Sequence, residues 1–561
     1  MRSSRLSLLT FSALVVLLPV VIFAQVDTVW TNRWTSPGAE SDWAYAIAID
    51  DSGNVYVTGK VDNEDVTEDD WTTIKYQADG DTAWVRYYAS PGSPNERANA
   101  ITIAPSGNIY ITGYTMSPAN GNYLTIKYEP DGDTAWARTY NGTGDGYDFA
   151  RWVAVDDQEN VYVTGYSRTL TSYPSDIVTV KYDSSGTQLW VAGFDGSGNR
   201  GDQGNKVITD DNGYVYVVGY VNPYSSGTFY DYVTIKYDPL TGDTMWVRTY
   251  NGTADSSDQA TDMEVDASGN VYVTGSSRGS GTSTDIVTIK YDSTGFQEWV
   301  ARYNNPDTNG SDGGYGIKVD GAGNIYVTGQ SQGLGTGTDF VTVKYDSLGN
   351  QLWAIRYNGP ANGLDRPSDQ VGGKCIAIDQ YANIYVAGVS WNTTTYNDYI
   401  AIMYDSAGVE QWVVGYNGYD TLDYALAVAA NNSGDVCVTG RSLGLTTYYD
   451  WATVKYHSTV GVEEDTSPAA NRLLLEAHPN PARAHSTVSY SLTNEGAVTL
   501  AIYDVSGRLV KSLVSGYQRP DVYSIVWNGK DDNNRKVAPG VYFYVLKTNG
   551  DHVSKKIVMM E

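Results

Sequence analysis

Residues 258–275, DQATDMEVDASGNVYVTG, decide the fold of this chain, because variants of this stretch return at a nearly fixed spacing. The closing glycine recurs every 52 to 59 residues, at Gly59, Gly113, Gly165, Gly219, Gly275, Gly329, Gly388 and Gly440. Self-similarity at such a period is typical of a chain built from copies of one supersecondary unit. The sequence therefore predicts eight repeat units.

Each unit contains four short segments in which apolar and polar residues alternate. The first precedes a Gly-containing turn, the second is the NVYVTG string, the third ends in a string like TIKY (residues 73–76), and the fourth centres on a Trp. Alternation with a period of two predicts strands, and Gly in the turn supplies a positive φ. Four strands in each of eight units predict an all-β protein with an eight-bladed β-propeller.

The phase of the repeat predicts how the ring closes. A Trp segment at residues 27–34 precedes every other strand, whereas the eighth unit ends at Tyr456 with no Trp segment after it. Pairing these two segments gives the last blade its fourth strand and removes an exposed sheet edge. We expect the first strand of each unit to line the central channel.

The chain is strongly acidic, with 37 Lys+Arg against 65 Asp+Glu and a formal net charge of −28. Residues 461–561 hold 11 basic and 11 acidic residues, so the excess lies in residues 25–460. An acidic propeller argues against nucleic acid as a partner, because phosphates attract Lys and Arg. All four histidines lie at or beyond His457, so most of the chain lacks an imidazole for general base catalysis or metal binding.

The N-terminus has the pattern of an export signal. Arg2 and Arg5 precede an apolar run that ends at Ala24, which predicts a signal peptide over residues 1–24. No later stretch is apolar enough to span a bilayer. We therefore expect an exported propeller over residues 25–460, without a transmembrane segment once the signal is removed.

Charged residues interrupt the repeat on the first strands of units four to six, at Lys206, Asp262, Glu264 and Lys318. Asp262 and Glu264 lie two residues apart on one face of a strand, roughly 7 Å from each other, which is compatible with glycoside hydrolysis. The alternative is an ion network in which the lysines neutralise the carboxylates, because buried charges usually have partners. As a ligand-binding site this cluster is the strongest candidate, and no catalytic residue is assigned.

Aspartates recur where first strands begin (Asp42, Asp148, Asp202, Asp258, Asp312 and Asp423) and where third strands begin (Asp70, Asp176, Asp231, Asp285, Asp339, Asp398 and Asp450). Carboxylates at turn starts accept backbone N–H bonds, so we expect them to cap loops. Calcium held between loops is the alternative, since this ion prefers carboxylate oxygens. No other cofactor is expected. Cys375 and Cys437 fall at different strand positions, which predicts free thiols.

The loops that differ most between units are residues 60–72 and 220–233. Loops on a rigid scaffold commonly carry recognition. Aromatic loop residues are candidates for stacking on sugars or for packing loop on loop: Trp391, Tyr396, Tyr448 and Tyr449.

Residues 258–275 resemble the bacterial β-propeller repeat family, whose unit reads D-x-A-x-x-I-x-V-D-x-x-G-N-V-Y-V-T-G. The resemblance implies the fold and no particular chemistry. Residues 238–246, DPLTGDTMW, also resemble the tryptophan-docking motif of eight-bladed quinoprotein propellers. That second resemblance implies that the motif packs blade against blade.

Residues 461–477 read as a linker, and the short alternating segments of residues 478–561 suit a small Ig-like sandwich. This tail resembles the sorting domain of the type IX secretion system and the Ig-like domain of flagellar hook-capping proteins. The resemblance rests on Pro479-Asn480-Pro481, Ile502-Tyr503-Asp504, Gly507-Arg508, Trp527-Asn528-Gly529, Gly540-Val541-Tyr542 and residues 555–558. It implies export across the outer membrane of a Gram-negative cell, with residues 478–561 read by the secretion machinery.

Together these features predict a secreted or cell-surface propeller that binds a glycan or a protein. One alternative is a secreted polysaccharide hydrolase or lyase that uses Asp262 and Glu264. The other is a surface protein with a structural role that calcium stabilises.

Overall fold

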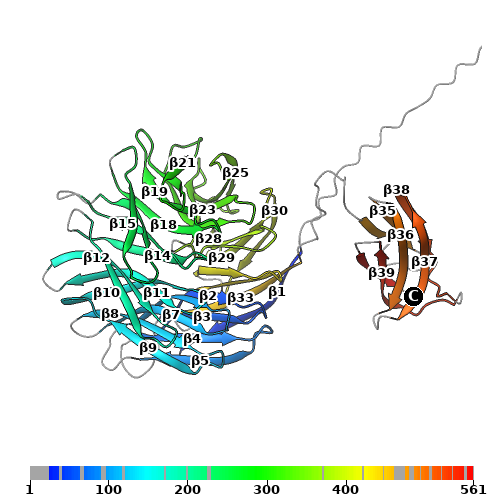
Figure 1. Ribbon diagram of the computed structural model, residues 1–561, viewed down its shortest axis with the longest axis horizontal. Helices are drawn as coiled ribbons and strands as arrows, with labels where there is room; N and C mark the ends of the chain where they lie inside the picture. Colours follow the sequence, from blue (N-terminus) through cyan, green and yellow to red (C-terminus); the bar gives the residue numbers. More distant parts are fainter. Residues whose placement is uncertain are drawn as a thin grey trace, which may run out of the picture. The chain divides into compact units, whose positions relative to one another are not determined.

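The computed structural model describes residues 25–459 and 474–559, apart from short gaps at 37–40, 63–68, 90–95, 117–119, 170–171, 197–199, 224–228, 255, 369–371, 420–421, 446–447, 479–485, 493–494, 505–507, 520, 533–534 and 549–551. The chain divides into two compact units, Met1–Gly461 and Val462–Glu561. In the described residues every helix or strand is a β-strand, as Figure 1 shows. Among these residues there is accordingly no helix with the length and apolar character to cross a membrane.

The strands of the larger unit fall into four sets according to their place in the repeat. The first strands are β2 (Trp43–Ile49), β6 (Arg97–Ile103), β10 (Asp145–Val155), β14 (Gln203–Thr209), β18 (Asp258–Val265), β22 (Asp312–Val319), β26 (Asp365–Pro367) with β27 (Ile376–Ile378), and β31 (Asp423–Ala430). The second strands are β3 (Val55–Asp62), β7 (Ile109–Met116), β11 (Val161–Thr169), β15 (Val215–Val221), β19 (Val271–Arg278), β23 (Ile325–Gln332), β28 (Ile384–Asn392) and β32 (Asp435–Leu443). The third strands are β4 (Asp69–Tyr76), β8 (Gly121–Tyr128), β12 (Ser172–Tyr182), β16 (Asp231–Tyr237), β20 (Thr284–Tyr291), β24 (Thr338–Tyr345), β29 (Tyr396–Tyr404) and β33 (Tyr449–Thr459). The fourth strands are β5 (Thr82–Tyr88), β9 (Thr134–Tyr140), β13 (Gln188–Phe194), β17 (Thr244–Tyr250), β21 (Gln297–Tyr303), β25 (Gln351–Tyr357), β30 (Glu410–Tyr416) and β1 (Gln25–Trp34).

Most sheets are four-stranded meanders, such as β2-β3-β4-β5 and β18-β19-β20-β21. A single parallel pair between Tyr147 and Gly121 joins the sheets of units two and three. The predicted first strand of unit seven is divided into β26 and β27, which both pair with β28. Figure 1 shows fourth strands such as β5, β9, β21 and β25 at the outside of the larger unit.

The N-terminal strand lies where the sequence predicts it. β1 pairs antiparallel with β33, from Gln25 opposite Thr459 to Trp34 opposite Trp451. The last sheet has the order β1-β33-β32-β31, so the chain's first strand is its fourth strand. The pairing covers an edge of β33 that would otherwise expose unpaired N–H and C=O groups.

The apolar side chains of each sheet are buried against the neighbouring sheet. Tyr56 and Trp84 of unit one pack with Ile109 and Ile111 of unit two in one such cluster. Another cluster joins Trp30 of β1 to residues of unit one. Full burial of a Val or Ile side chain contributes about 1.5–3 kcal/mol, so the repeated alternation stabilises every one of these contacts.

A glycine in the turn between third and fourth strands packs on the Trp of the preceding unit. Gly242 has a φ of +76°, and a Cβ there would lie 2.8 Å from the Trp190 ring. The Trp190 Nε1 donates to the Pro239 carbonyl at 3.1 Å. The docking interpretation of residues 238–246 is therefore confirmed, and Gly80 makes the same contact with Trp30.

A carboxylate supports the turn between first and second strands in most units. Asp266 accepts N–H bonds from Ser268 and Asn270 and an O–H bond from Tyr272. Unit two has Ala104 at the equivalent position. There Glu159 of unit three accepts a hydrogen bond from Tyr110 Oη at 2.5 Å. A carboxylate of the neighbouring unit thus takes the place of the missing aspartate.

The smaller unit has two sheets, one of β34 (Leu474–His478), β35 (Ser486–Leu492) and β38 (Asp521–Trp527), the other of β37 (Leu509–Gln518), β36 (Gly496–Asp504), β39 (Gly540–Lys547) and β40 (His552–Met559). Both sheets contribute to one core, for example Trp527 and Tyr490 from the first and Leu500 and Tyr544 from the second. β34 lies partly within the predicted linker 461–477, so the smaller fold begins before residue 478. The predicted signal peptide, residues 461–473 of the linker and Pro479–Pro481 lie outside the described residues.

Candidate functional site

The four charged residues predicted as a ligand site lie together on β14, β18 and β22. Lys206 Nζ is 2.7 Å from Asp262 Oδ1 and 3.5 Å from Glu264 Oε1. Lys318 Nζ pairs with the same Glu264 oxygen. Asp262 is fully buried and also accepts the Ile317 N–H at 2.8 Å. Two cations meet two anions, and we call these four residues the channel ion network.

The electrostatics of this network favour the charged forms of Glu264 and Lys206. Burial opposes the charge of Glu264, but Lys318 and Lys206 outweigh it and hold the pKa of this carboxyl below its usual value. Burial likewise opposes the charge of Lys206, yet Asp262 and Glu264 raise its pKa. A general acid for glycoside hydrolysis needs a raised carboxyl pKa, so this geometry fits the ion-network interpretation better than the catalytic one.

Residues 372–375, which we call the crossing segment, lie between β26 and β27 and reach the first strands of other units. Gly372 N–H donates to Thr261 O of β18 at 3.1 Å. A Cβ on Gly372 would lie 2.2 Å from the Trp152 ring, and one on Gly373 would lie 1.9 Å from Asp262 Oδ2. Both glycines have positive φ, so no other residue fits either position without a shift of its surroundings.

Lys374 of the crossing segment lies between units two, three and eight. Its Nζ donates to Asn99 O and is 5.7 Å from the Trp152 ring centre. Its backbone carbonyl accepts the Val428 N–H at 2.8 Å. Burial, followed by the charges of Arg97 and Arg151, lowers the pKa of Lys374 to about 7.

Three arginines continue this positive region along the first and second strands of neighbouring units. Arg97 stacks on Tyr45 at 3.6 Å, and Arg441 lies 3.5 Å from the ring centre of Trp43. Arg151 donates to Gln203 Oε1 at 3.3 Å. We call Arg97, Arg151, Lys374 and Arg441 the cationic patch.

The cationic patch differs from the ion network in the counter-charges of three of its four residues. Within the part of the chain that the structure describes, no carboxylate forms an ion pair with Arg151, Lys374 or Arg441. The Nε atoms of Arg151 and Arg441 are buried and have no acceptor among those residues. Burial lowers the pKa of both guanidinium groups, because charge without a counter-charge is costly to bury.

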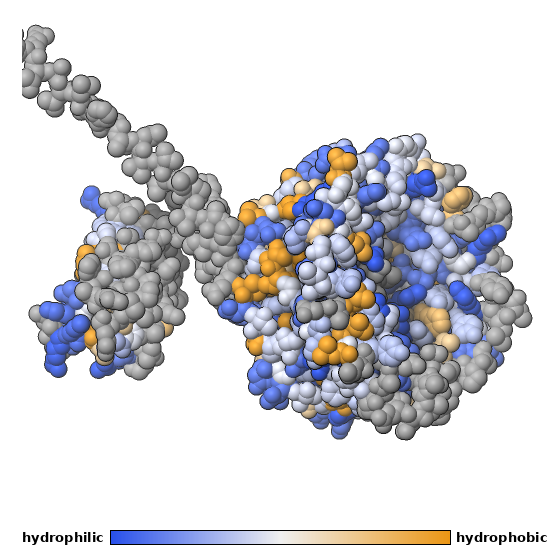
Figure 2. Space-filling view, turned by 180° about the vertical axis from the view of Figure 1, so that it is seen from behind, coloured by the Kyte–Doolittle hydropathy of each residue, from blue (hydrophilic) through white to orange (hydrophobic). Residues whose placement is uncertain are grey.

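The arginines of the patch lie at one end of the sheets, which we call the loop end. At this end the second strand of a unit connects to its third strand, and the fourth strand connects to the first strand of the next unit. Exposed tyrosines occur on its loops and adjoining strand termini, namely Tyr147, Tyr396, Tyr419 and Tyr448. Tyr449 instead packs against Arg441. In the view of Figure 2, the coloured residues of the larger unit are mainly hydrophilic, and the apolar residues lie in separate groups.

The aspartates that begin first strands cap loops, as predicted. Asp202 accepts the Gly196 N–H at 2.6 Å and the Asn222 N–H at 2.8 Å, and Asp42 accepts the Ser36 and Asp62 N–H groups. Most of these aspartates have a neighbour in the preceding unit, the aspartate that begins the third strand there. In three units an arginine from the fourth strand of the same unit binds that neighbouring aspartate. The three ion pairs are Arg302–Asp285, Arg356–Asp339 and Arg33–Asp450.

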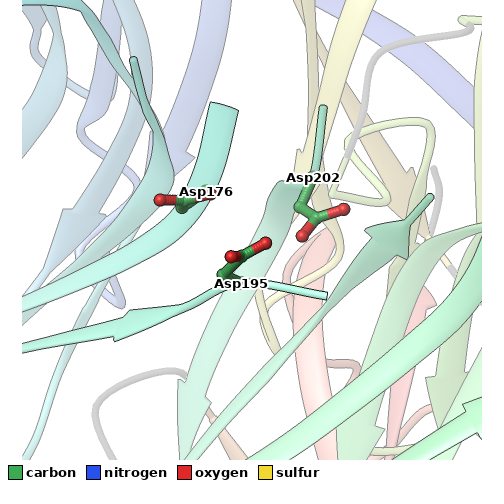
Figure 3. A group of neighbouring side chains, drawn as sticks. All are labelled: Asp176, Asp195 and Asp202. Atoms are coloured by element: carbon green, nitrogen blue, oxygen red, sulfur yellow. The ribbon is translucent and has the colours of Figure 1, made fainter. Parts of the chain in front are cut away.

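Gly193 takes the place of that arginine in unit three, and a third carboxylate joins the pair. Asp176, Asp195 and Asp202 point toward one another, each with an oxygen within 4.8 Å of the others, as Figure 3 shows. Burial is the main cause that raises the pKa of Asp202, to about 6. The backbone hydrogen bonds oppose this rise, and the charges of Asp195 and Asp176 add to it. The donor type suits calcium, and calcium binding stays a prediction.

The residues singled out in the sequence thus have different outcomes. Cys375 and Cys437 are buried and form no disulfide among the described residues, as predicted. The middles of the variable loops, residues 63–68 and 224–228, lie outside the described residues. Sequence reasoning missed the cationic patch. The available signals were the interval of 59 residues before Gly388, which contains the crossing segment, and arginines at repeat positions of an acidic chain.

Comparisons with known proteins support both folds. The family model for the beta-propeller repeat matches residues 36–63 and 298–335, and the model for the FlgD Ig-like domain matches residues 482–551. A curated relative, the uncharacterized WD repeat-containing protein L264 of Acanthamoeba polyphaga mimivirus, is 29% identical over 147 residues. That match covers 23% of this chain and only 10% of the relative's length.

Solved structures with a related arrangement are distant. PorZ, a surface component of the type-IX secretion system of Porphyromonas gingivalis, is 13% identical, with a TM-score of 0.39 over 91% of this chain and 68% of PorZ. Quinohemoprotein alcohol dehydrogenase from Comamonas testosteroni is 13% identical, with a TM-score of 0.45 over 81% of this chain and 79% of that one. The polysaccharide lyase Uly1 is 10% identical, with a TM-score of 0.36 over 74% and 90%. TM-scores below 0.5 carry no argument about activity or partners. The chain therefore has β-propeller repeats followed by an Ig-like domain.

Proposed function

We propose that this protein is an exported, surface-associated binding protein whose propeller holds its ligand at the loop end. The observation that carries the proposal is the cationic patch, in which Arg151, Lys374 and Arg441 have no carboxylate partner among the described residues. Charges that a chain does not neutralise itself are commonly the contact points of a ligand.

The scaffold of this proposal is a closed ring of eight blades. Support comes from contacts that link the last unit to the first. Trp30 of β1 packs under Gly80 of unit one and donates from Nε1 to Ala78 O at 3.1 Å. Trp451 of β33 donates from Nε1 to Lys60 O at 3.0 Å. A ring without free edges is rigid, which suits a scaffold that presents loops.

An ion network explains the channel charges better than hydrolysis does. Asp262 is bound by Lys206 and by backbone N–H groups, and Glu264 is bound by both lysines. Neither carboxylate is left to donate or accept a proton from substrate. Replacing Asp262 and Glu264 by Asn and Gln, followed by assays on a panel of polysaccharides, separates the two functions, because turnover by the parent chain that disappears in the variant would support an enzyme.

Export is proposed from the two ends of the chain. The predicted signal peptide directs residues 25–561 out of the cytoplasm, and the Ig-like domain acts as the sorting signal for the type IX secretion machinery of a Gram-negative cell. The test is a secretion assay in a host with that machinery, with and without residues 462–561. Release of both chains to the medium would contradict the sorting role.

The binding function itself is tested on an array of glycans and cell-surface proteins probed with the full chain. The expected result is a ligand whose binding falls when loop-end residues are replaced. A matched set of substitutions in the turns at the opposite end of the sheets, for example Leu240→Ser, serves as the control, because Leu240 is 83% exposed and far along the chain from the patch residues. Binding that responds equally to both sets would contradict the proposal.

A further inference from the structure

We propose that the cationic patch binds an acidic polysaccharide through the carboxylates of uronic acid residues. This inference rests on the proposed function and names the ligand class for the same site. Three features of the patch support it: hydrogen-bond donors of the right shape, a local excess of positive charge, and surroundings that favour a sugar chain over an acidic protein.

The donors are the in-plane N–H groups of two guanidinium ions. Arg441 presents its faces to Trp43, at 3.5 Å, and to Tyr424, at 4.6 Å. Ring contacts of this kind occupy the face of a guanidinium and leave its edge available. Arg441 and Arg151 are only partly buried, so a ligand can reach their guanidinium groups, and their Nε atoms have no acceptor among the described residues. A planar carboxylate is the acceptor that fits such an edge with two parallel hydrogen bonds.

The charges around these donors require an anion. After burial, like-charge repulsion from Arg97 and Arg151 lowers the pKa of Lys374, and repulsion from Arg97 lowers the pKa of Arg151. The chain as a whole has a net charge of −28, so a cluster of cations contrasts with the acidic composition of the rest of the chain. A carboxylate placed among them would relieve the repulsion and favour the charged form of Lys374.

A single polysaccharide chain suits this position better than an acidic protein does. The remainder of the propeller is acidic, so a broad acidic partner would be repelled by the surface around the patch. A narrow chain touches little beyond the patch. The exposed tyrosines of the loop end, Tyr419 at 44% and Tyr448 at 62% exposure, offer flat apolar faces on which the C–H faces of sugar rings can pack.

The test is isothermal titration calorimetry of the full chain with polygalacturonate, dextran sulfate, neutral dextran and poly-L-glutamate. We expect polygalacturonate to bind, neutral dextran not to bind, and added salt to weaken the binding. Poly-L-glutamate carries carboxylates on a peptide chain, and dextran sulfate carries tetrahedral anions on a sugar chain. Tighter binding of either than of polygalacturonate would overturn the assignment.

The variants are Arg151→Lys and Arg441→Lys, which keep the positive charge and remove the planar fork. Each is expected to weaken polygalacturonate binding about tenfold, the size of one lost hydrogen bond to a charged group. Arg278→Ala is the control, because Arg278 is an exposed arginine at the loop-end terminus of β19. A melting curve of each variant verifies the fold. Unchanged affinity in both lysine variants would overturn the inference.

Failure of this inference is distinguishable from failure of the proposed function. If polygalacturonate does not bind but the array yields a neutral glycan or a protein that depends on the loop end, the uronate assignment is wrong and the binding function stands. If nothing binds at the loop end, both are wrong.

Discussion

The two charged regions on the first strands differ in how their charges are balanced. In the channel ion network, Lys206 and Lys318 form ion pairs with Asp262 and Glu264. In the cationic patch, Lys374 and Arg151 face other cations, and the pKa of Lys374 falls to about 7. Charges that the chain neutralises itself belong to its stability, whereas charges left uncompensated indicate a partner outside it.

The crossing segment connects these two regions. Gly373 lies against Asp262 of the network, and the next residue, Lys374, belongs to the patch. One insertion in unit seven thus contacts both regions. The following experiments test the contrast between them, beginning with the largest expected effect.

Asp262→Asn is expected to lower the free energy of unfolding by about 3–5 kcal/mol, because it leaves the buried ammonium of Lys206 with a weaker partner. Urea unfolding measures the loss. The double variant Lys206→Met with Asp262→Asn is expected to recover part of it, since the uncompensated charge is then absent. A loss below about 1 kcal/mol in the single variant would show that the network is not a stabilising unit.

Gly373→Ala is expected to cost about 2–3 kcal/mol, because its Cβ would meet Asp262 Oδ2 at 1.9 Å in a backbone with a φ of +73°. Gly321→Ala is the control, since a Cβ there meets nothing within 4 Å. Thermal melts of the two variants measure the difference. Equal melting temperatures would mean that the crossing segment does not pack tightly in the channel.

Lys374→Met is expected to remove a pH dependence of stability. The pKa of Lys374 is about 7 in the folded chain against an ordinary value of 10.5, so between these values the unfolded chain binds more protons and stability rises with pH. In the variant that rise is smaller by about 1 kcal/mol or more. Urea unfolding of both proteins across this window measures it, and identical slopes would contradict the low pKa.

Asp195→Asn is expected to give the smallest effect, a stabilisation of about 0.3–0.5 kcal/mol at neutral pH. The pKa of Asp202 is about 6, above its ordinary value, so its contribution to stability is lost as pH rises from 3.8 to 6. Removing the neighbouring charge reduces that loss. Asp157→Asn, at an exposed turn of unit three, is the control.

The same melts test calcium. A rise in melting temperature with calcium that a chelator reverses, and that Asp195→Asn abolishes, would show that the three carboxylates hold the ion. Without such a rise, capping by backbone N–H groups accounts for these aspartates.

Repetition made most of the fold predictable. The spacing of Gly59, Gly113 and their equivalents gave the units, and the unmatched Trp segment at residues 27–34 gave the pairing of β1 with β33. These features follow from local sequence, because alternation and turn chemistry act within a few residues. The network was also predictable, since its residues break the repeat on neighbouring first strands: Lys206 lies at the repeat position of Asp262, and Lys318 at that of Glu264.

Other features depend on contacts between residues that are far apart in the sequence. That Glu159 replaces the carboxylate missing at Ala104 follows from the packing of unit three on unit two. That Lys374 lies beside Arg97 and Arg151 depends on the route of the crossing segment, because Lys374 and Asn99, 275 positions apart in the chain, meet only in the folded structure. Strand patterns are encoded by side chains acting over short distances, whereas the balance of charge at a site is a sum over every group that the tertiary fold brings near it.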